Sequence, residues 1–175
     1  YPDLPLVGIE PAVKPAAQNH RGEKVAVMAT PLTLHEEKFK QLVKRYENLA
    51  TIIPVPCPDL VEYVEKGILE GPELEGYLKD VLTPCLQEGV KAVVLGCTHF
   101  PLVKAAIGKV VGESVRIYDG GEGTARQAKC LLAAKNLCTD QEKGHICFES
   151  SAPEKEAYYE ALYRKAAHID SRVKL

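Results

Sequence analysis

The chain has 175 residues, a formal net charge of −2 and 46% hydrophobic residues. This near-neutral balance lacks the basic face typical of nucleic-acid-binding proteins, and no apolar run approaches the roughly 20 residues that span a bilayer. We therefore expect a globular cytoplasmic protein without nucleic-acid or membrane partners.

The first residues, 1–6, are predicted to form a linker, because Pro2 and Pro5 favour a loop that runs into a strand. The chain starts at Tyr1, and its one methionine is Met28. We interpret the sequence as a fragment or a processed product of a longer protein.

Strands and helices are predicted to alternate along the chain. Short runs rich in β-branched residues predict strands, and helical periodicity fills the segments between them. This order is typical of an α/β fold, in which helices flank a parallel sheet. The predicted strands cover residues 6–9, 25–29, 51–55, 92–95, 115–118 and 145–149.

The predicted helices carry local signals of their own. The clearest apolar periodicity covers residues 74–86, although Pro84 is expected to kink or shorten that helix. Further helices are predicted over residues 102–111, 122–134 and 154–167. Two more helix starts are predicted by the capping boxes Thr33-x-x-Glu36 and Asp59-x-x-Glu62.

Strands become rare after residue 119. Residues 7–119 are predicted to form one complete flavodoxin-like or Rossmann-like domain, whereas residues 120–175 hold one strand and two helices. A lone strand leaves both of its hydrogen-bonding edges unpaired. We therefore expect residues 120–175 to complete a second α/β domain whose other strands lie outside this chain.

Cys97 is the strongest candidate for chemistry. The apolar run 91–96 fits a central parallel strand, and Cys97 falls at its carboxyl end, where open α/β sheets place their ligands. The dipole of the helix that Pro101 begins would favour a thiolate, and His99 could exchange a proton with it. An inert buried cysteine beside a hydrogen-bonded histidine is the alternative.

The other five cysteines form no C-x-x-C pair and do not combine with the histidines at zinc-ligand spacings. We expect most of them to be small buried hydrophobic residues, and we expect no metal site. They are Cys57, Cys85, Cys130, Cys138 and Cys147.

Glu65 is the second candidate. It lies on the flank of a predicted helix, one turn after Val61, where a carboxylate at the edge of the core can orient a histidine. An exposed position near the helix end at Gly67 is the alternative, and the residues alone favour it.

Thr30 and Thr33 follow the predicted strand 25–29, again at a carboxyl end. Their hydroxyls and nearby backbone amides could hold a substrate carboxylate, although Thr33 is also the predicted helix cap. The glycine-rich segment 120–123 lacks the lysine of a phosphate-binding loop, so it predicts only a turn and a helix start.

Taken together, these residues resemble the glutamate racemases of the aspartate/glutamate racemase family in order and spacing. The match runs from about Val7 to Arg126, and its most specific part is Gly-Cys-Thr-His, which cofactor-independent aspartate racemases share in similar form. The matching motifs are Val7-Gly8-Ile9-Glu10-Pro11, Ala29-Thr30-Pro31-Leu32-Thr33, Cys57-Pro58 with Val61 and Glu65, Leu95-Gly96-Cys97-Thr98-His99-Phe100-Pro101, and Asp119.

The resemblance implies cofactor-independent conversion of L-glutamate to D-glutamate for peptidoglycan, with neither metal nor pyridoxal phosphate. Two cysteines face the substrate α-carbon from opposite sides of a cleft between two α/β domains; one removes the proton and the other returns one. Cys97 matches the cysteine on the L-glutamate side, and His99 matches its acid/base partner. Glu65 matches a carboxylate that assists the cysteine, and Thr98 and Thr33 match residues near the substrate.

The chain also departs from the family pattern. The N-terminal Asp-Ser-Gly motif and the first Cys-Asn-Thr motif are absent, so the isolated chain is expected to be inactive. Phe100 replaces a commoner tyrosine, and Gly120 follows Asp119 where serine or another residue is usual. An aspartate racemase-like enzyme, a non-catalytic ligand-binding domain and a Cys-His thiol hydrolase are the alternatives, and homodimerisation stays open.

Overall fold

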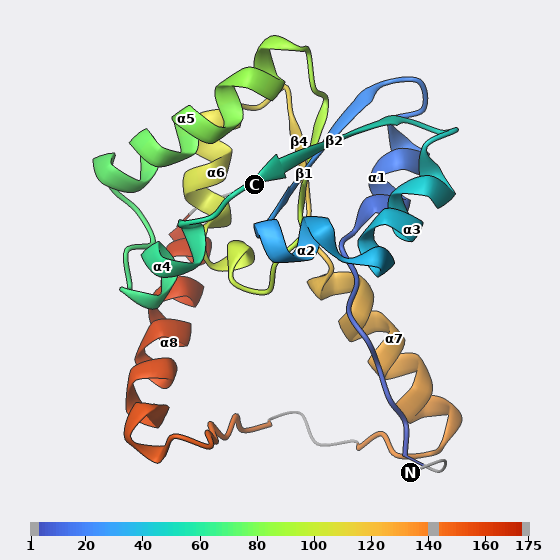
Figure 1. Cartoon of the computed structure of the whole chain (residues 1–175). Helices are drawn as coiled ribbons and strands as arrows, with labels where there is room; N and C mark the ends of the chain where they lie inside the picture. The colour runs from blue at the N-terminus through green and yellow to red at the C-terminus, as the bar shows by residue number, and fades with distance from the viewer. Residues whose placement is uncertain (1–3, 140–143, 173–175) are drawn as a thin grey trace.

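A parallel four-stranded sheet forms the centre of the molecule (Figure 1). The computed structural model describes residues 4–139 and 144–172. The strand order is β2-β1-β3-β4, and every neighbouring pair runs parallel. The predicted α/β class is therefore confirmed. The strands are β1 (Lys24–Ala29), β2 (Thr51–Pro56), β3 (Ala92–Leu95) and β4 (Arg116–Tyr118).

Helices cover both faces of the sheet. Alternate residues of β1 point to opposite faces, so Val25 and Val27 join one core cluster while Ala26 and Met28 join the other. The first cluster is closed by α1 (Val13–Asn19) and α3 (Glu37–Tyr46), and the second by α5 and α6. The second pair of helices spans Pro72–Gln87 (α5) and Lys104–Val111 (α6).

Shorter elements and two long helices complete the described chain. Helix α7 has no buried residue, whereas α8 buries Leu162 and Ala166 in the core cluster that α5 and α6 close. In Figure 1, α7 and α8 extend from the same end of the sheet on opposite sides. These elements are α2 (Pro31–His35), α4 (Leu60–Glu65), η1 (Phe100–Val103), α7 (Gly121–Ala134), η2 (Pro153–Lys155) and α8 (Glu156–Arg172).

Two of the predicted strands are wrong. Residues 6–9 and 145–149 belong to no strand. Leu6 and Ile9 are 75% and 54% exposed, so the apolar side chains of the run that suggested a strand lie outside the core. The prediction that residues 120–175 complete a second domain relied on a lone strand at residues 145–149, and the structure has no strand there. The role of residues 120–175 therefore stays a prediction.

Local details of the helices also differ from the sequence predictions. Helix α5 continues through Pro84 to Gln87, because the flanking Leu82 and Cys85 are buried and anchor its last turn. The capping box at Thr33 is wrong: Thr30 caps α2, accepting a hydrogen bond from the Thr33 amide at 3.3 Å. Asp59 does precede α4, but its side chain makes no capping bond.

The edge strand β2 carries two prolines, Pro54 and Pro56. The backbone N–H groups of Thr51 and Cys57 donate to carbonyls of the β1 side, Glu23 and Ala29, at 2.9 Å each. Because alternate residues of a strand point in opposite directions, both prolines face away from β1.

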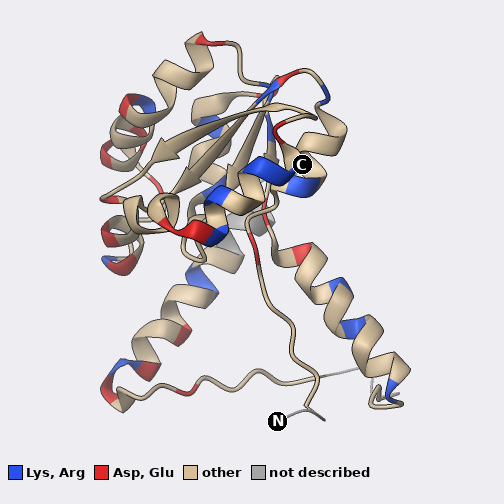
Figure 2. Ribbon diagram, turned by 45° about the vertical axis from the view of Figure 1, so that its right-hand side comes forward, with Lys and Arg blue, Asp and Glu red and all other residues tan. Residues whose placement is uncertain are grey.

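Acidic and basic residues are interspersed over the outer helices, as Figure 2 shows. This mixture agrees with the small net charge of −2. Within the described ranges, no helix is long and apolar enough to cross a membrane.

Candidate functional site

The carboxyl ends of the four strands lie at one edge of the sheet, because all of them run parallel. Thr30 follows β1, Cys57 follows β2, Cys97 comes two residues after β3, and Asp119 follows β4. Sequence reasoning placed Cys97 and Thr30 at strand ends, and the structure brings these ends together.

Gly96 lets the chain leave β3 close to its neighbour. Its N–H donates to the Met28 carbonyl at 2.8 Å, and a Cβ at this position would lie 2.7 Å from the same oxygen. A side chain here would therefore collide with the backbone of β1. The glycine fixes the path of the chain into Cys97.

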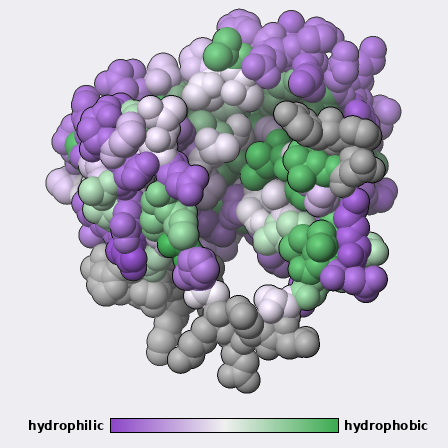
Figure 3. Space-filling view, turned by 90° about the horizontal axis from the view of Figure 1, so that it is seen from below, coloured by the Kyte–Doolittle hydropathy of each residue, from purple (hydrophilic) through white to green (hydrophobic). Residues whose placement is uncertain are grey.

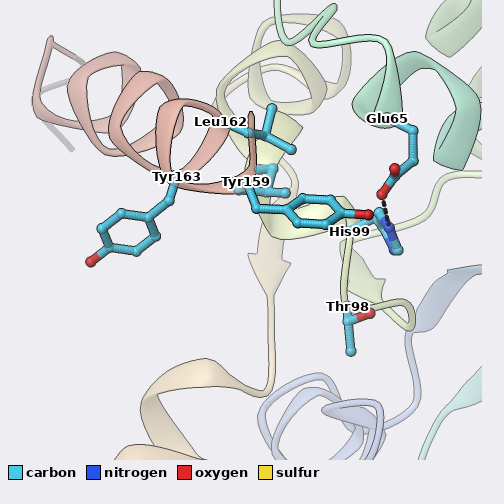
Figure 4. Close-up of a pocket in the computed structure, with 7 residues that line it drawn as sticks. Glu65, Thr98, His99, Tyr159, Leu162 and Tyr163 are labelled. Carbon is cyan, nitrogen blue, oxygen red and sulfur yellow. Dashed lines mark hydrogen bonds and ion pairs between the residues drawn. The ribbon is translucent and has the colours of Figure 1, made fainter. Parts of the chain in front are cut away.

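Cys97, His99 and Glu65 form a row of interacting side chains. The Cys97 Sγ lies 3.8 Å from Nδ1 of His99. On the other side of the ring, Nε2 of His99 lies 2.9 Å from Oε1 of Glu65, the contact that Figure 4 marks with a dashed line. Because an ionised carboxylate only accepts hydrogen bonds, Nε2 carries the proton of the neutral ring, and Nδ1 faces the thiol as an acceptor. The arrangement can pass a proton between sulfur and imidazole.

An open cavity of about 290 Å³ lies beside this row. In Figure 4 the Tyr159 side chain extends toward His99, and Tyr163 points away from it. Figure 3 shows the underside of the molecule hollowed between the α7 and α8 sides. The lining residues are Glu65, Thr98, His99, Leu102, Tyr159, Leu162 and Tyr163.

The residues from α8 were missed by sequence reasoning. Tyr159, Leu162 and Tyr163 belong to a helix whose apolar stripe looks like any core-facing stripe, and nothing local indicates which core it faces. Their place beside His99 follows from packing between segments far apart in the chain, which periodicity does not report.

Thr98 and the two other threonines occupy different surroundings. Thr98 lines the cavity, whereas Thr30 and Thr33 share a hydrogen bond of 3.0 Å between their hydroxyls and lie outside that lining. The bond leaves each hydroxyl oxygen with further capacity to bind a ligand. Their assignment as substrate-binding residues stays a prediction.

The remaining cysteines divide into two groups. Burial, followed by the nearby Cys85, raises the pKa of the Cys57 thiol to about 12, and its Sγ donates to the Val55 carbonyl at 3.4 Å. Burial likewise raises the pKa of Cys85. The expectation of burial holds for these two and is wrong for Cys130, Cys138 and Cys147, which are exposed.

Asp119 anchors the start of α7. Its carboxylate accepts hydrogen bonds from Lys104 Nζ and from the Gly121 amide, both at 2.9 Å. Partial burial acts to raise the pKa of Asp119, but these two bonds outweigh it, and the pKa is lowered. The turn and helix start predicted at the glycine-rich segment are confirmed.

We expect the lowered pKa of Asp119 to contribute acid-dependent stability. A depressed pKa stabilises the fold above the ordinary value of 3.8, and this contribution is lost as the pH falls through the folded-state pKa. In urea unfolding, Asp119→Asn should be less stable than the unmodified chain at pH 6, and the difference should shrink below about pH 4. The control is Asp80→Asn, at an exposed position of α5; an equal and constant difference for both variants would contradict the prediction.

The fold and the row of side chains define a class of protein: a parallel α/β domain that holds a thiol, an imidazole and a carboxylate at the carboxyl edge of its sheet. The profile of the Asp/Glu/Hydantoin racemase family matches residues 2–128. The chain therefore belongs to the Asp/Glu/Hydantoin racemase family.

Individual relatives agree with this assignment. The chain is 44% identical over 156 residues to a glutamate racemase of Clostridium perfringens, covering 89% of this chain and 60% of that protein. A glutamate racemase of Clostridium kluyveri is 48% identical over 140 residues, covering 80% of this chain and 54% of the relative. The chain thus spans 54 to 60% of the length of these curated relatives.

Solved structures show the same fold. Escherichia coli glutamate racemase, determined with L-glutamate and the activator UDP-MurNAc-Ala, superposes with a TM-score of 0.74 at 31% identity, over 93% of this chain and 62% of that chain. Thermus thermophilus glutamate racemase, determined with β-chloro-D-alanine, gives a TM-score of 0.62 at 29% identity, over 87% and 56% of the two chains.

Proposed function

We propose that the whole protein interconverts L- and D-glutamate without a cofactor and supplies D-glutamate for peptidoglycan. The observation that carries the proposal is the row of Cys97, His99 and Glu65 at the carboxyl edge of the sheet. The family and the glutamate racemases among its relatives support glutamate as the substrate.

Cys97 is proposed to act on the L-glutamate side. As the thiolate, its sulfur takes the α-proton, so that the Cα–H bond breaks, an S–H bond forms and the electron pair remains on the substrate as a carbanion. A thiol on the opposite face then donates a proton to the α-carbon, which gives D-glutamate. In the reverse direction the Cys97 thiol is the donor.

His99 and Glu65 are proposed to control the protonation of Cys97. Nδ1 of His99 takes the proton from Sγ before the reaction, which leaves the thiolate, and Glu65 holds the ring through Nε2. Thr98, Thr30 and Thr33 are proposed to hold the substrate through their hydroxyls and nearby backbone amides.

The domain organisation forms part of the proposal. Residues 7–119 would be the α/β domain that carries Cys97, residues 1–6 a linker, and residues 120–175 part of a second α/β domain facing the same substrate. The described residues bring one thiol, Cys97, into contact with His99. The 175-residue chain on its own is therefore expected not to racemise glutamate.

Proton exchange tests the proposal directly. The whole protein, incubated with L-glutamate in deuterated water, should replace the α-proton by deuterium and generate D-glutamate, as measured by proton NMR and circular dichroism. L-Aspartate serves as the matched substrate, because it differs by one methylene. Exchange of aspartate without exchange of glutamate would favour an aspartate racemase, and loss of the L-glutamate signal with the 175-residue chain alone would contradict the two-sided mechanism.

A further inference from the structure

The last four carbonyl groups of α4 all accept hydrogen bonds, three of them from residues close in sequence and one from another helix. The last four carbonyls of a helix lack partners within the helix. Here the Glu62 carbonyl accepts from Lys66 N–H at 2.9 Å. The next two carbonyls, of Tyr63 and Val64, accept from Ile68 and Gly67 N–H at 2.9 and 2.8 Å, which is a Schellman closure with Gly67 at φ +70°.

The final carbonyl of α4 belongs to Glu65, and it is satisfied from another part of the chain. The hydroxyl of Tyr158, on α8, donates to it. Two turns further along α8, Lys165 Nζ donates to the Gly67 carbonyl at 2.7 Å. Helix α8 therefore caps the end of α4 at two points.

The two donors lie on the stripe by which α8 packs on the domain. Tyr158, Leu162, Lys165 and Ala166 are spaced i, i+4, i+7 and i+8, so they share one face of the helix. Leu162 and Ala166 are 8% and 7% exposed and belong to the core cluster shared with α4 and η1. The apolar contacts thus fix α8 in place, and the two polar side chains reach the α4 carbonyls from that fixed helix.

We propose that Tyr158 and Lys165 are positioning residues for the site, because they hold the end of α4 so that the Glu65 carboxylate meets Nε2 of His99. The positioning of Glu65 does not depend on the proposed function; only the effect of that positioning on catalysis rests on it. Glu65 is the last residue of α4, so a displacement of its backbone displaces the carboxylate that selects the His99 tautomer. The ring would then no longer keep Nδ1 as the acceptor facing Cys97.

Nitrogen NMR of the histidine rings tests this positioning without any activity measurement. In the ¹⁵N-histidine-labelled 175-residue chain at neutral pH, the neutral His99 ring should show the Nε2–H tautomer, and His99→Gln assigns its signals. In the double variant Tyr158→Phe with Lys165→Met, the two ring nitrogen shifts should move toward the averaged values of a free imidazole. Tyr158→Phe and Lys165→Met alone should each give part of that change.

Matched variants separate positioning from general destabilisation. Tyr46→Phe removes a hydroxyl from α3, and Lys129→Met removes an exposed ammonium from α7; both should leave the His99 shifts unchanged. Thermal unfolding checks that each variant remains folded at the temperature of the spectra. His99 shifts that stay at the values of the unmodified chain in both single variants would overturn the proposal.

The whole protein supplies a second readout. If glutamate is the substrate, Tyr158→Phe should lower kcat about fivefold with KM almost unchanged, because Tyr158 orders a catalytic side chain and is not proposed to touch substrate. An increase of KM with unchanged kcat would contradict a positioning role. If glutamate is not turned over at all, the proposed function fails, and the NMR result still decides the positioning role.

Discussion

Replacing Cys97 by serine in the whole protein is expected to abolish most of the α-proton exchange of L-glutamate. A hydroxyl is a much weaker acid than a thiol, so serine supplies almost no anion to accept the proton, although its size is similar. Loss of a positioned acid/base group costs about 10²- to 10⁴-fold in rate. Deuterium incorporation at the α-carbon, followed by proton NMR, measures this decrease.

Cys130→Ser is the matched control, because Cys130 is an exposed thiol on α7. It should leave the exchange rate unchanged, which excludes a general effect of removing a cysteine. Exchange of both glutamate enantiomers at the unmodified rate in the Cys97→Ser protein would rule out the role proposed for Cys97. A rate that falls equally in both variants would point instead to a loss of the fold.

Replacing Phe100 by alanine is expected to cause the largest loss of stability. Phe100 is the largest of the fully buried side chains, at 0% exposure, and it follows His99 directly at the start of η1. Truncation of a buried phenylalanine costs about 3 to 5 kcal/mol of unfolding free energy, because apolar burial is lost and a cavity remains. That loss is a large share of the roughly 5 to 15 kcal/mol that stabilises an ordinary domain.

Urea unfolding of the 175-residue chain, followed by circular dichroism, measures the effect. Leu32→Ala is the control, since Leu32 is 74% exposed and its truncation should change the unfolding free energy by less than about 0.5 kcal/mol. A loss below about 1 kcal/mol for Phe100→Ala would show that the η1 segment contributes little to the core.

The central sheet was predictable from sequence because its strands are short, strongly apolar runs. The strand β3 is buried at all four of its positions, so its residues are apolar without interruption, as a central parallel strand requires. Residues 6–9 have a similar composition but lie outside the sheet. Composition alone therefore did not distinguish a strand from a segment outside the sheet, because a strand also needs backbone hydrogen bonds to a neighbouring strand, which composition does not report.

The candidate site was predictable only in part. The thiol Cys97 could be placed from its own neighbours, since a strand end followed by a helix start is a local pattern. The contact between Glu65 and His99 could not be predicted in this way. Glu65 lies on α4 and His99 precedes η1, and helical periodicity does not specify which segments of the chain lie next to each other. The residues alone made Glu65 a candidate but favoured an exposed position, and the resemblance to a family favoured its role beside the cysteine. Only the structure supplied Tyr158 and Lys165.

The prolines of the edge strand β2 bear on whether a strand of another molecule can add to this edge of the sheet. A strand at the edge of a sheet offers a row of free N–H and C=O groups onto which a strand of another molecule can add. The outward N–H positions of β2 fall at Ile52, Pro54 and Pro56, and proline has no N–H. One outward N–H donor, that of Ile52, is left along β2, so the carbonyl groups of an incoming strand would find few donors, which disfavours the addition of a strand at this edge.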